Sequence, residues 1–135
     1  LDDYEEGEFI VTLANSLAAT GSQKKLTYTK IGRQVTVAGE LQLNNLGSVA
    51  SGELRFSLPF AIPDLTGGGD RFVGAVQTRN VNHTANAVSL VAKAVVGTQY
   101  FYLVEVTDDG LESSVTGAMC ASNDEVTVTL TYFTS

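Results

Sequence analysis

The chain has very little of the chemistry on which metal sites, disulfide frameworks and most nucleophilic active sites depend. Its 135 residues include one cysteine, Cys120, and one histidine, His83. A single cysteine cannot form an internal disulfide, and one cysteine with one histidine is too few for a typical zinc site. Cys120 follows Ala118 and Met119 in a small, apolar stretch, so we expect a buried and unreactive thiol. We expect no bound metal and no cofactor.

Basic residues are also scarce. Eight lysines and arginines stand against 15 acidic residues, the formal net charge is −7, and no basic cluster exceeds Lys24-Lys25. Nucleic-acid binding needs several phosphate contacts from basic side chains, and an acidic chain is repelled by anionic membrane surfaces. The composition therefore argues against a nucleic-acid partner and against membrane binding.

No hydrophobic run approaches the roughly 20 residues that span a bilayer. The length fits one domain, and the share of hydrophobic residues, 44%, is enough for a packed core. The acidic residues 1–7 resemble a linker. We expect them to be a connector from an upstream region, followed by one domain over residues 8–135.

Apolar and polar residues alternate over most of the chain. Because successive side chains of a strand point to opposite faces, this pattern predicts strands with one buried face. Strands are expected at residues 8–14, 25–31, 34–43, 53–58, 71–78, 87–96, 98–106 and 126–132. The residues expected in the core are Val35, Val37, Leu41, Leu54, Phe56, Leu58, Val126, Val128 and Leu130.

Turns are expected at residues 20–22, 44–47, 67–70, 96–98 and 108–110, most of them rich in glycine or asparagine. Many short strands separated by such turns predict an all-β, antiparallel β-sandwich, jelly-roll-like in its topology. The alanines of residues 84–95 would also suit a helix, which makes that strand the weakest prediction. Residues 98–106 are apolar on both faces, from Tyr100 to Val104. Such a strand is either central in a sandwich or packed against another subunit.

A Ser-His-Asp or Cys-His catalytic arrangement would have to use His83, which lies in the polar stretch 80–84 and is expected to be a solvated loop histidine. No Gly-x-Ser-x-Gly motif is present. Asp108-Asp109-Gly110 is better explained as a hairpin turn than as a pair of glycosidase carboxylates. We therefore expect the protein not to be an enzyme.

The loop at residues 64–70 contains two carboxylates and three glycines, features that occur in Ca²⁺ sites and in phosphate-binding loops. It lacks the regular spacing of calcium loops, and Gly67-Gly68-Gly69 is followed by a strand instead of a helix. A flexible loop without a ligand is the expected reading.

Four segments in order resemble the C-terminal domain of bacteriophage tail-fibre and tailspike proteins. They are Asp3-Tyr4-Glu5-Glu6-Gly7, residues 27–37 with the words Tyr-Thr-Lys and Val-Thr-Val, Leu58-Pro59-Phe60, and Leu130-Thr131-Tyr132-Phe133. The resemblance spans almost the whole chain and is weakest over residues 66–122. The chain departs from the pattern at Phe9-Ile10-Val11, where relatives often have Trp and Pro.

This resemblance implies a homotrimer at the tip of a virion tail or surface fibre that attaches to a host glycan or receptor. The two-sided strand 98–106 agrees with a trimer. Carbohydrate sites pair aromatic faces with polar groups, so the candidate ligand-binding residues are Asn80, Asn82, His83, Gln99, Tyr100 and Tyr102, provided that their loops converge. The alternative is a purely structural module that trimerises or caps a viral fibre. A glycan depolymerase is the third reading.

Overall fold

The computed structural model describes residues 3–13, 24–43, 52–64, 71–121 and 123–135. Within these segments all strands join one antiparallel sheet, and the only helix is a single 3₁₀ turn. The predicted all-β, antiparallel fold is therefore confirmed. The described segments include no helix both long and apolar enough to cross a membrane. The elements are β1 (Tyr4–Ile10), β2 (Lys25–Ile31), β3 (Gln34–Gln42), β4 (Phe56–Ser57), β5 (Arg71–Arg79), β6 (Ala87–Val95), β7 (Tyr100–Thr107), β8 (Glu112–Ser114), η1 (Gly117–Met119) and β9 (Glu125–Phe133).

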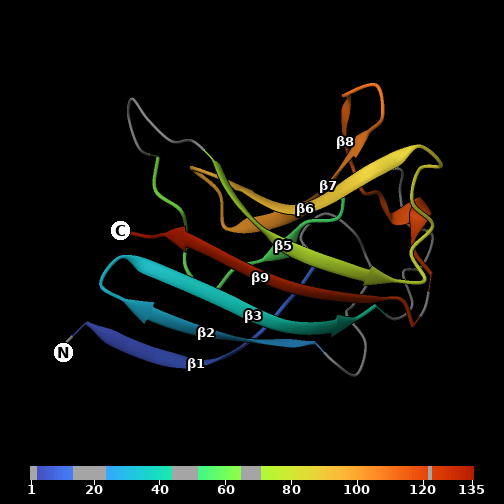
Figure 1. Ribbon diagram of the computed structural model, residues 1–135. Coiled ribbons are helices and arrows are strands. Elements are labelled where there is room, and N and C mark those ends of the chain that lie inside the picture. Colours follow the sequence, from blue (N-terminus) through green and yellow to red (C-terminus); the bar gives the residue numbers. More distant parts are fainter. Residues whose placement is uncertain (1–2, 14–23, 44–51, 65–70, 122) are drawn as a thin grey trace.

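The strand order is β1-β2-β3-β9-β5-β6-β7-β4, and β8 pairs with β7. The sheet curls so that β1, β2, β3 and β9 form one layer while β6 and β7 form the other (Figure 1). β5 connects the layers, because its first half pairs with β6 and its second half with β9. β5, β6 and β7 are consecutive neighbours, and β9 returns beside β5, which is a Greek key. The order thus contains one of the two Greek keys of a full jelly roll.

The crossing of β5 over β9 requires glycine at position 74. A Cβ atom on Gly74 would lie 2.3 Å from the carbonyl oxygen of Thr129 and 2.8 Å from the Cα atom of Leu130. Both atoms belong to the backbone of β9, so neither can rotate out of the way. A strand glycine at such a point allows two backbones to approach more closely than any side chain permits.

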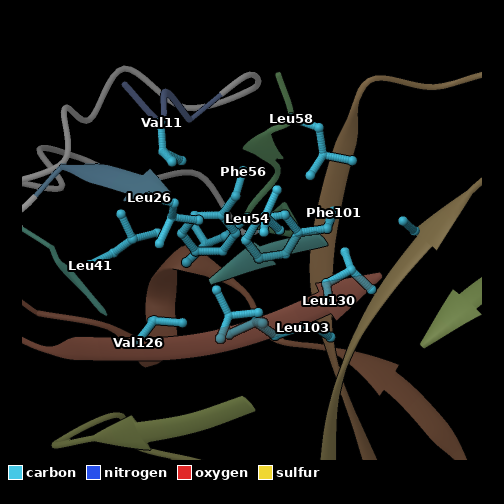
Figure 2. Close-up of a cluster of buried hydrophobic side chains, with 14 of the residues drawn as sticks. Val11, Leu26, Leu41, Leu54, Phe56, Leu58, Phe101, Leu103, Val126 and Leu130 are labelled. Carbon is cyan, nitrogen blue, oxygen red and sulfur yellow. The ribbon is translucent and has the colours of Figure 1, made fainter. Parts of the chain in front are cut away.

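The core lies between the two layers. All nine side chains predicted to be buried are buried, none more than 3% exposed. At the centre the rings of Phe56 and Phe101 stack with centroids 5.1 Å apart, and the aliphatic side chains of both layers surround them (Figure 2). β4 and β7 thus meet the inner face of β9 through one continuous apolar cluster.

The first strand and the strand predicted at residues 53–58 differ from the prediction: of the latter only Phe56–Ser57 pair, as β4, and the short strand β8 was not predicted. β1 begins at Tyr4 instead of residue 8, so Tyr4 to Gly7, expected as a connector, pair with β2. β1 is an edge strand, and charged residues such as Glu5 and Glu8 are typical of edges because they discourage pairing with other chains. Residues 87–95, the weakest prediction, do form a strand.

Two predicted turns are present, at Gly97 and at Asp108-Asp109-Gly110. Both glycines have a positive φ, 78° and 84°, which a residue with a side chain adopts only at a cost. The turns predicted near residues 20–22, 44–47 and 67–70 lie outside the described residues. The same holds for residues 65–70 of the candidate calcium or phosphate loop.

Candidate functional site

The six predicted ligand-binding residues do not form one site. Asn80, Asn82 and His83 lie in the connection between β5 and β6, whereas Gln99 and Tyr100 lie where β7 begins. In the antiparallel β6–β7 hairpin, Ala87 pairs with Thr107 and Ala94 pairs with Phe101. The two groups are therefore at opposite ends of the same hairpin.

At the first end, His83 is not the solvated histidine that the sequence suggested. Its side chain is 27% exposed, and both ring nitrogens have partners. Nδ1 lies 2.8 Å from Oε2 of Glu105, and Nε2 lies 2.6 Å from Oγ1 of Thr78. Asn80 and Asn82 are exposed, and the backbone N–H of Asn82 donates to the carbonyl of Met119.

Glu105 is the buried partner of this histidine, and its side chain has no exposed surface. Its carboxylate also accepts hydrogen bonds from the backbone N–H of Thr84, at 3.1 Å, and from the Thr84 hydroxyl. Burial alone raises the pKa of Glu105, but the hydrogen bonds from Thr84 and His83 outweigh it and hold the pKa below its ordinary value. Glu105 is thus a charged, fully bonded group inside the domain.

Thr78, His83 and Glu105 are hydrogen-bonded in the same sequence as a catalytic triad, in which a hydroxyl nucleophile contacts a histidine base and a carboxylate orients that histidine. The placement of the hydroxyl argues for a structural role. Thr78 is the register partner of Val126, which is 1% exposed, so its side chain lies on the core side of the sheet. The three side chains therefore connect β5, the β5–β6 connection and β7. An open groove of about 310 Å³ runs beside them, lined by residues 83, 84 and 87–90.

At the other end, Tyr100 and Tyr102 project from the face of β7 that points away from the core. They alternate with the buried Phe101 and Leu103, and each is half-buried. Register partners share a face, so Lys93, which pairs with Tyr102, lies on this outer face. Val73 pairs with Lys93, and Arg71 is two residues from Val73, so β5 extends the same face.

We refer to this surface as the tyrosine face, which comprises Glu53, Arg55, Arg71, Lys93, Tyr100, Tyr102 and Glu112. The two tyrosine rings have centroids 6.5 Å apart, and the guanidinium of Arg55 lies 4.8 Å from the ring of Tyr100. Such a cation–π contact orients both groups. The surface therefore combines aromatic rings with charged hydrogen-bonding groups.

Ion pairs order the charged groups of the tyrosine face. Nε of Arg55 lies 2.9 Å from Oε1 of Glu53, whose other oxygen accepts a hydrogen bond of 2.8 Å from Ser114. Nζ of Lys93 lies 2.5 Å from Oε1 of Glu112. Burial raises the pKa of Tyr102, and the nearby negative charges of Glu53 and Glu112 raise it further. Tyr102 therefore keeps its hydroxyl proton at neutral pH and can donate as well as accept.

Gln99 has a different role from the one predicted. Its side-chain N–H donates to the backbone carbonyl of Leu58 at 3.0 Å, and the backbone carbonyl of Gln99 accepts from the backbone N–H of Leu58. It thus ties the start of β7 to the segment after β4. Of the tyrosine face, sequence reasoning found Tyr100 and Tyr102 and missed the charged residues around them. The turn at Gly97 was the available signal, because a hairpin closed there places Lys93 opposite Tyr102.

Comparison of the chain with protein-family models, with curated proteins and with solved structures finds no match. Within the described segments, no three His, Cys, Asp or Glu side chains gather in a way that could hold a metal ion. The tyrosine face and the sequence resemblance are therefore the two observations from which a function can be argued.

Proposed function

We propose that the protein is the tip domain of a virion fibre or spike and attaches to a host cell surface by binding a glycan without catalysis. The tyrosine face carries the proposal. A sugar ring presents apolar C–H groups that pack on aromatic side chains, while its hydroxyls form hydrogen bonds with carboxylates, amines and guanidinium groups. Tyr100 and Tyr102 offer the first kind of contact, and Glu53, Arg55 and Lys93 the second.

Rigidity of the tyrosine face supports the proposal. Both tyrosines lie on β7, which pairs with β6 on one side and with β4 and β8 on the other. The surrounding side chains are held by the Arg55–Glu53 and Lys93–Glu112 ion pairs. Side chains that are ordered before the ligand arrives lose less conformational entropy on binding. A weak polar ligand such as a sugar benefits from this preorganisation.

The homotrimer is part of the proposal and rests on the sequence resemblance. The two-sided strand 98–106 supports it less than expected, because Val104 is only 2% exposed within the single chain and Glu105 interrupts the apolar pattern with a buried charge. Tyr100 and Tyr102 are the aromatic side chains that remain on the outer face. A trimer would present three tyrosine faces, and linked weak sites gain avidity. Light scattering at about 0.1 M salt, where charge repulsion is screened beyond about 10 Å, should give the mass of three chains.

A glycan array tests the binding proposal. Wild-type protein should bind a subset of bacterial surface polysaccharides, and the double variant Tyr100→Ala/Tyr102→Ala should lose that binding while keeping its circular dichroism spectrum. A blank array from a protein that remains a stable trimer would refute attachment and favour the purely structural module. Binding that survives the double variant would move the site away from the tyrosine face.

A further inference from the structure

The tyrosine face differs in charge from the rest of the molecule. The chain carries eight basic and 15 acidic residues, yet three of the eight, Arg55, Arg71 and Lys93, belong to this face. Among the residues that the structure describes, the acidic residues of this face are Glu53 and Glu112. In a strongly acidic protein, such a local excess of positive charge creates a favourable potential for an anion.

Two of the three cations already have partners. Arg55 is paired with Glu53, and Lys93 with Glu112, and the Lys93 side chain is only 13% exposed. Arg71 is exposed and forms no ion pair or hydrogen bond with any residue that the structure describes. It begins β5, in the strand next to Lys93 and Val95. Its positive charge is close enough to act on the hydroxyl of Tyr102 and to oppose the rise of its pKa.

We infer that the tyrosine face binds a saccharide that carries a carboxylate, with Arg71 pairing with the carboxylate and Tyr102 packing against the sugar ring. This inference rests on the proposed glycan-binding function and narrows it to acidic sugars. The planar guanidinium fork matches a carboxylate with two parallel hydrogen bonds, which adds both strength and direction. Glu53 and Glu112, which keep Arg55 and Lys93 occupied, leave Arg71 as the cation that a ligand can neutralise.

The chain offers a matched control for Arg71. Arg79 lies at the other end of the same strand, eight residues or roughly 26 Å away, and is also exposed. Its guanidinium is 3.7 Å from a carboxylate oxygen of Glu125. Arg71→Gln and Arg79→Gln therefore change the net charge by the same amount on the same outer face of β5, but only the first alters the tyrosine face.

The experiment measures binding of the full chain, displayed in several copies on streptavidin so that weak sites are detected. The probes are polygalacturonate, hyaluronan and polysialic acid, the carboxyl-reduced form of each, and the neutral polymers dextran and mannan. We expect binding to at least one acidic polymer and none to its reduced form. Arg71→Gln should weaken that binding about tenfold or more, as expected for the loss of a charge-assisted hydrogen-bond pair, whereas Arg79→Gln should leave it within about twofold.

The outcomes separate the inference from the proposed function. Binding that persists on the carboxyl-reduced polymers, binding to dextran or mannan alone, or equal losses in the two arginine variants would overturn the acidic-sugar inference and leave glycan attachment standing. Binding to none of the polymers, together with a blank array of bacterial polysaccharides, would overturn both.

Discussion

Replacing Glu105 should destabilise the domain by an amount that depends on what takes its place. Leucine would leave three donors without an acceptor, namely Nδ1–H of His83 and the backbone N–H and hydroxyl of Thr84. Removing one partner of a buried charged network costs about 3–5 kcal/mol. We therefore expect Glu105→Leu to lower the free energy of unfolding by about 3–5 kcal/mol at pH 7.

Glutamine should cost less because it can keep every hydrogen bond. Its amide oxygen can take the place of Oε2 and accept from His83 and from the Thr84 backbone. Its NH₂ group then faces the Thr84 hydroxyl, which can accept instead of donate. A hydrogen bond to a charged acceptor is about 1 kcal/mol stronger than one to a neutral acceptor. Glu105→Gln should therefore lose about 1–3 kcal/mol at pH 7.

The pH dependence gives a further check on Glu105. Its pKa in the folded protein lies below the ordinary value of 4.5, so its charged form stabilises the fold above that pH, and this stabilisation is lost as the pH falls through the folded pKa. Urea titrations of wild type and Glu105→Gln should give stabilities that converge as the pH is lowered from 7 to well below 4.5. A Leu variant within about 1 kcal/mol of wild type, or a wild-type–Gln difference that is unchanged by pH, would refute a buried and bonded carboxylate.

Three other changes test the fold and the thiol. Gly74→Ala should cost about 3 kcal/mol or more, because the added Cβ atom would meet the carbonyl oxygen of Thr129 at 2.3 Å. Gly97→Ala has no atom within 4 Å of the added Cβ atom and should cost only the roughly 1–2 kcal/mol that its positive φ requires. Similar losses in the two variants would argue against a close approach of β5 to β9. Phe56→Ala should cost about 3–5 kcal/mol in a denaturant titration, and a loss below about 1 kcal/mol would mean that its strand face is misassigned. Cys120 is half-buried instead of fully buried as expected, but this burial raises its pKa to about 12. Iodoacetamide at pH 8 should therefore label it far more slowly in native than in unfolded protein, and rapid labelling of native protein would contradict this.

The alternation of apolar and polar residues was sufficient to predict most strands, because each of these strands has one buried face. A shift of the strand register by one residue would expose all the apolar side chains of that face. Val126, Val128 and Leu130 follow this rule and are buried. β1 follows it less well. As an edge strand it carries Glu5, Glu6 and Glu8. Without knowledge of the pairing with β2, such a charged segment is typical of a linker, so residues 4–7 were predicted as one.

The order of the strands could not be predicted, because it depends on contacts between distant segments. β9 lies between β3 and β5, although some 80 residues separate β9 from β3 in the sequence. Gly74 is the residue that permits the crossing, yet nothing in its sequence neighbourhood distinguishes it from a strand glycine of another kind.

The candidate site could be predicted only in part for the same reason. Tyr100 and Tyr102 stand out in the sequence as aromatics two positions apart, on one face of the strand. Arg55 and Arg71 join them only through the pairing of β7 with β4 and of β5 with β6. Glu105 was missed because it continues a strand that reads as apolar, and its partner His83 reaches it across the β5–β6 connection.

The most direct test of the account is the affinity of the tyrosine face for a polysaccharide selected on the array. Biolayer interferometry should compare wild type with Tyr102→Ala and with Tyr4→Ala, an exposed tyrosine on the edge strand β1. Loss of one aromatic contact from a binding site costs about 2 kcal/mol or more at a central position, so Tyr102→Ala should weaken binding at least about 30-fold, whereas Tyr4→Ala should change it less than about twofold. Equal affinities for wild type and Tyr102→Ala, with both proteins folded, would contradict the claim that this face binds glycan.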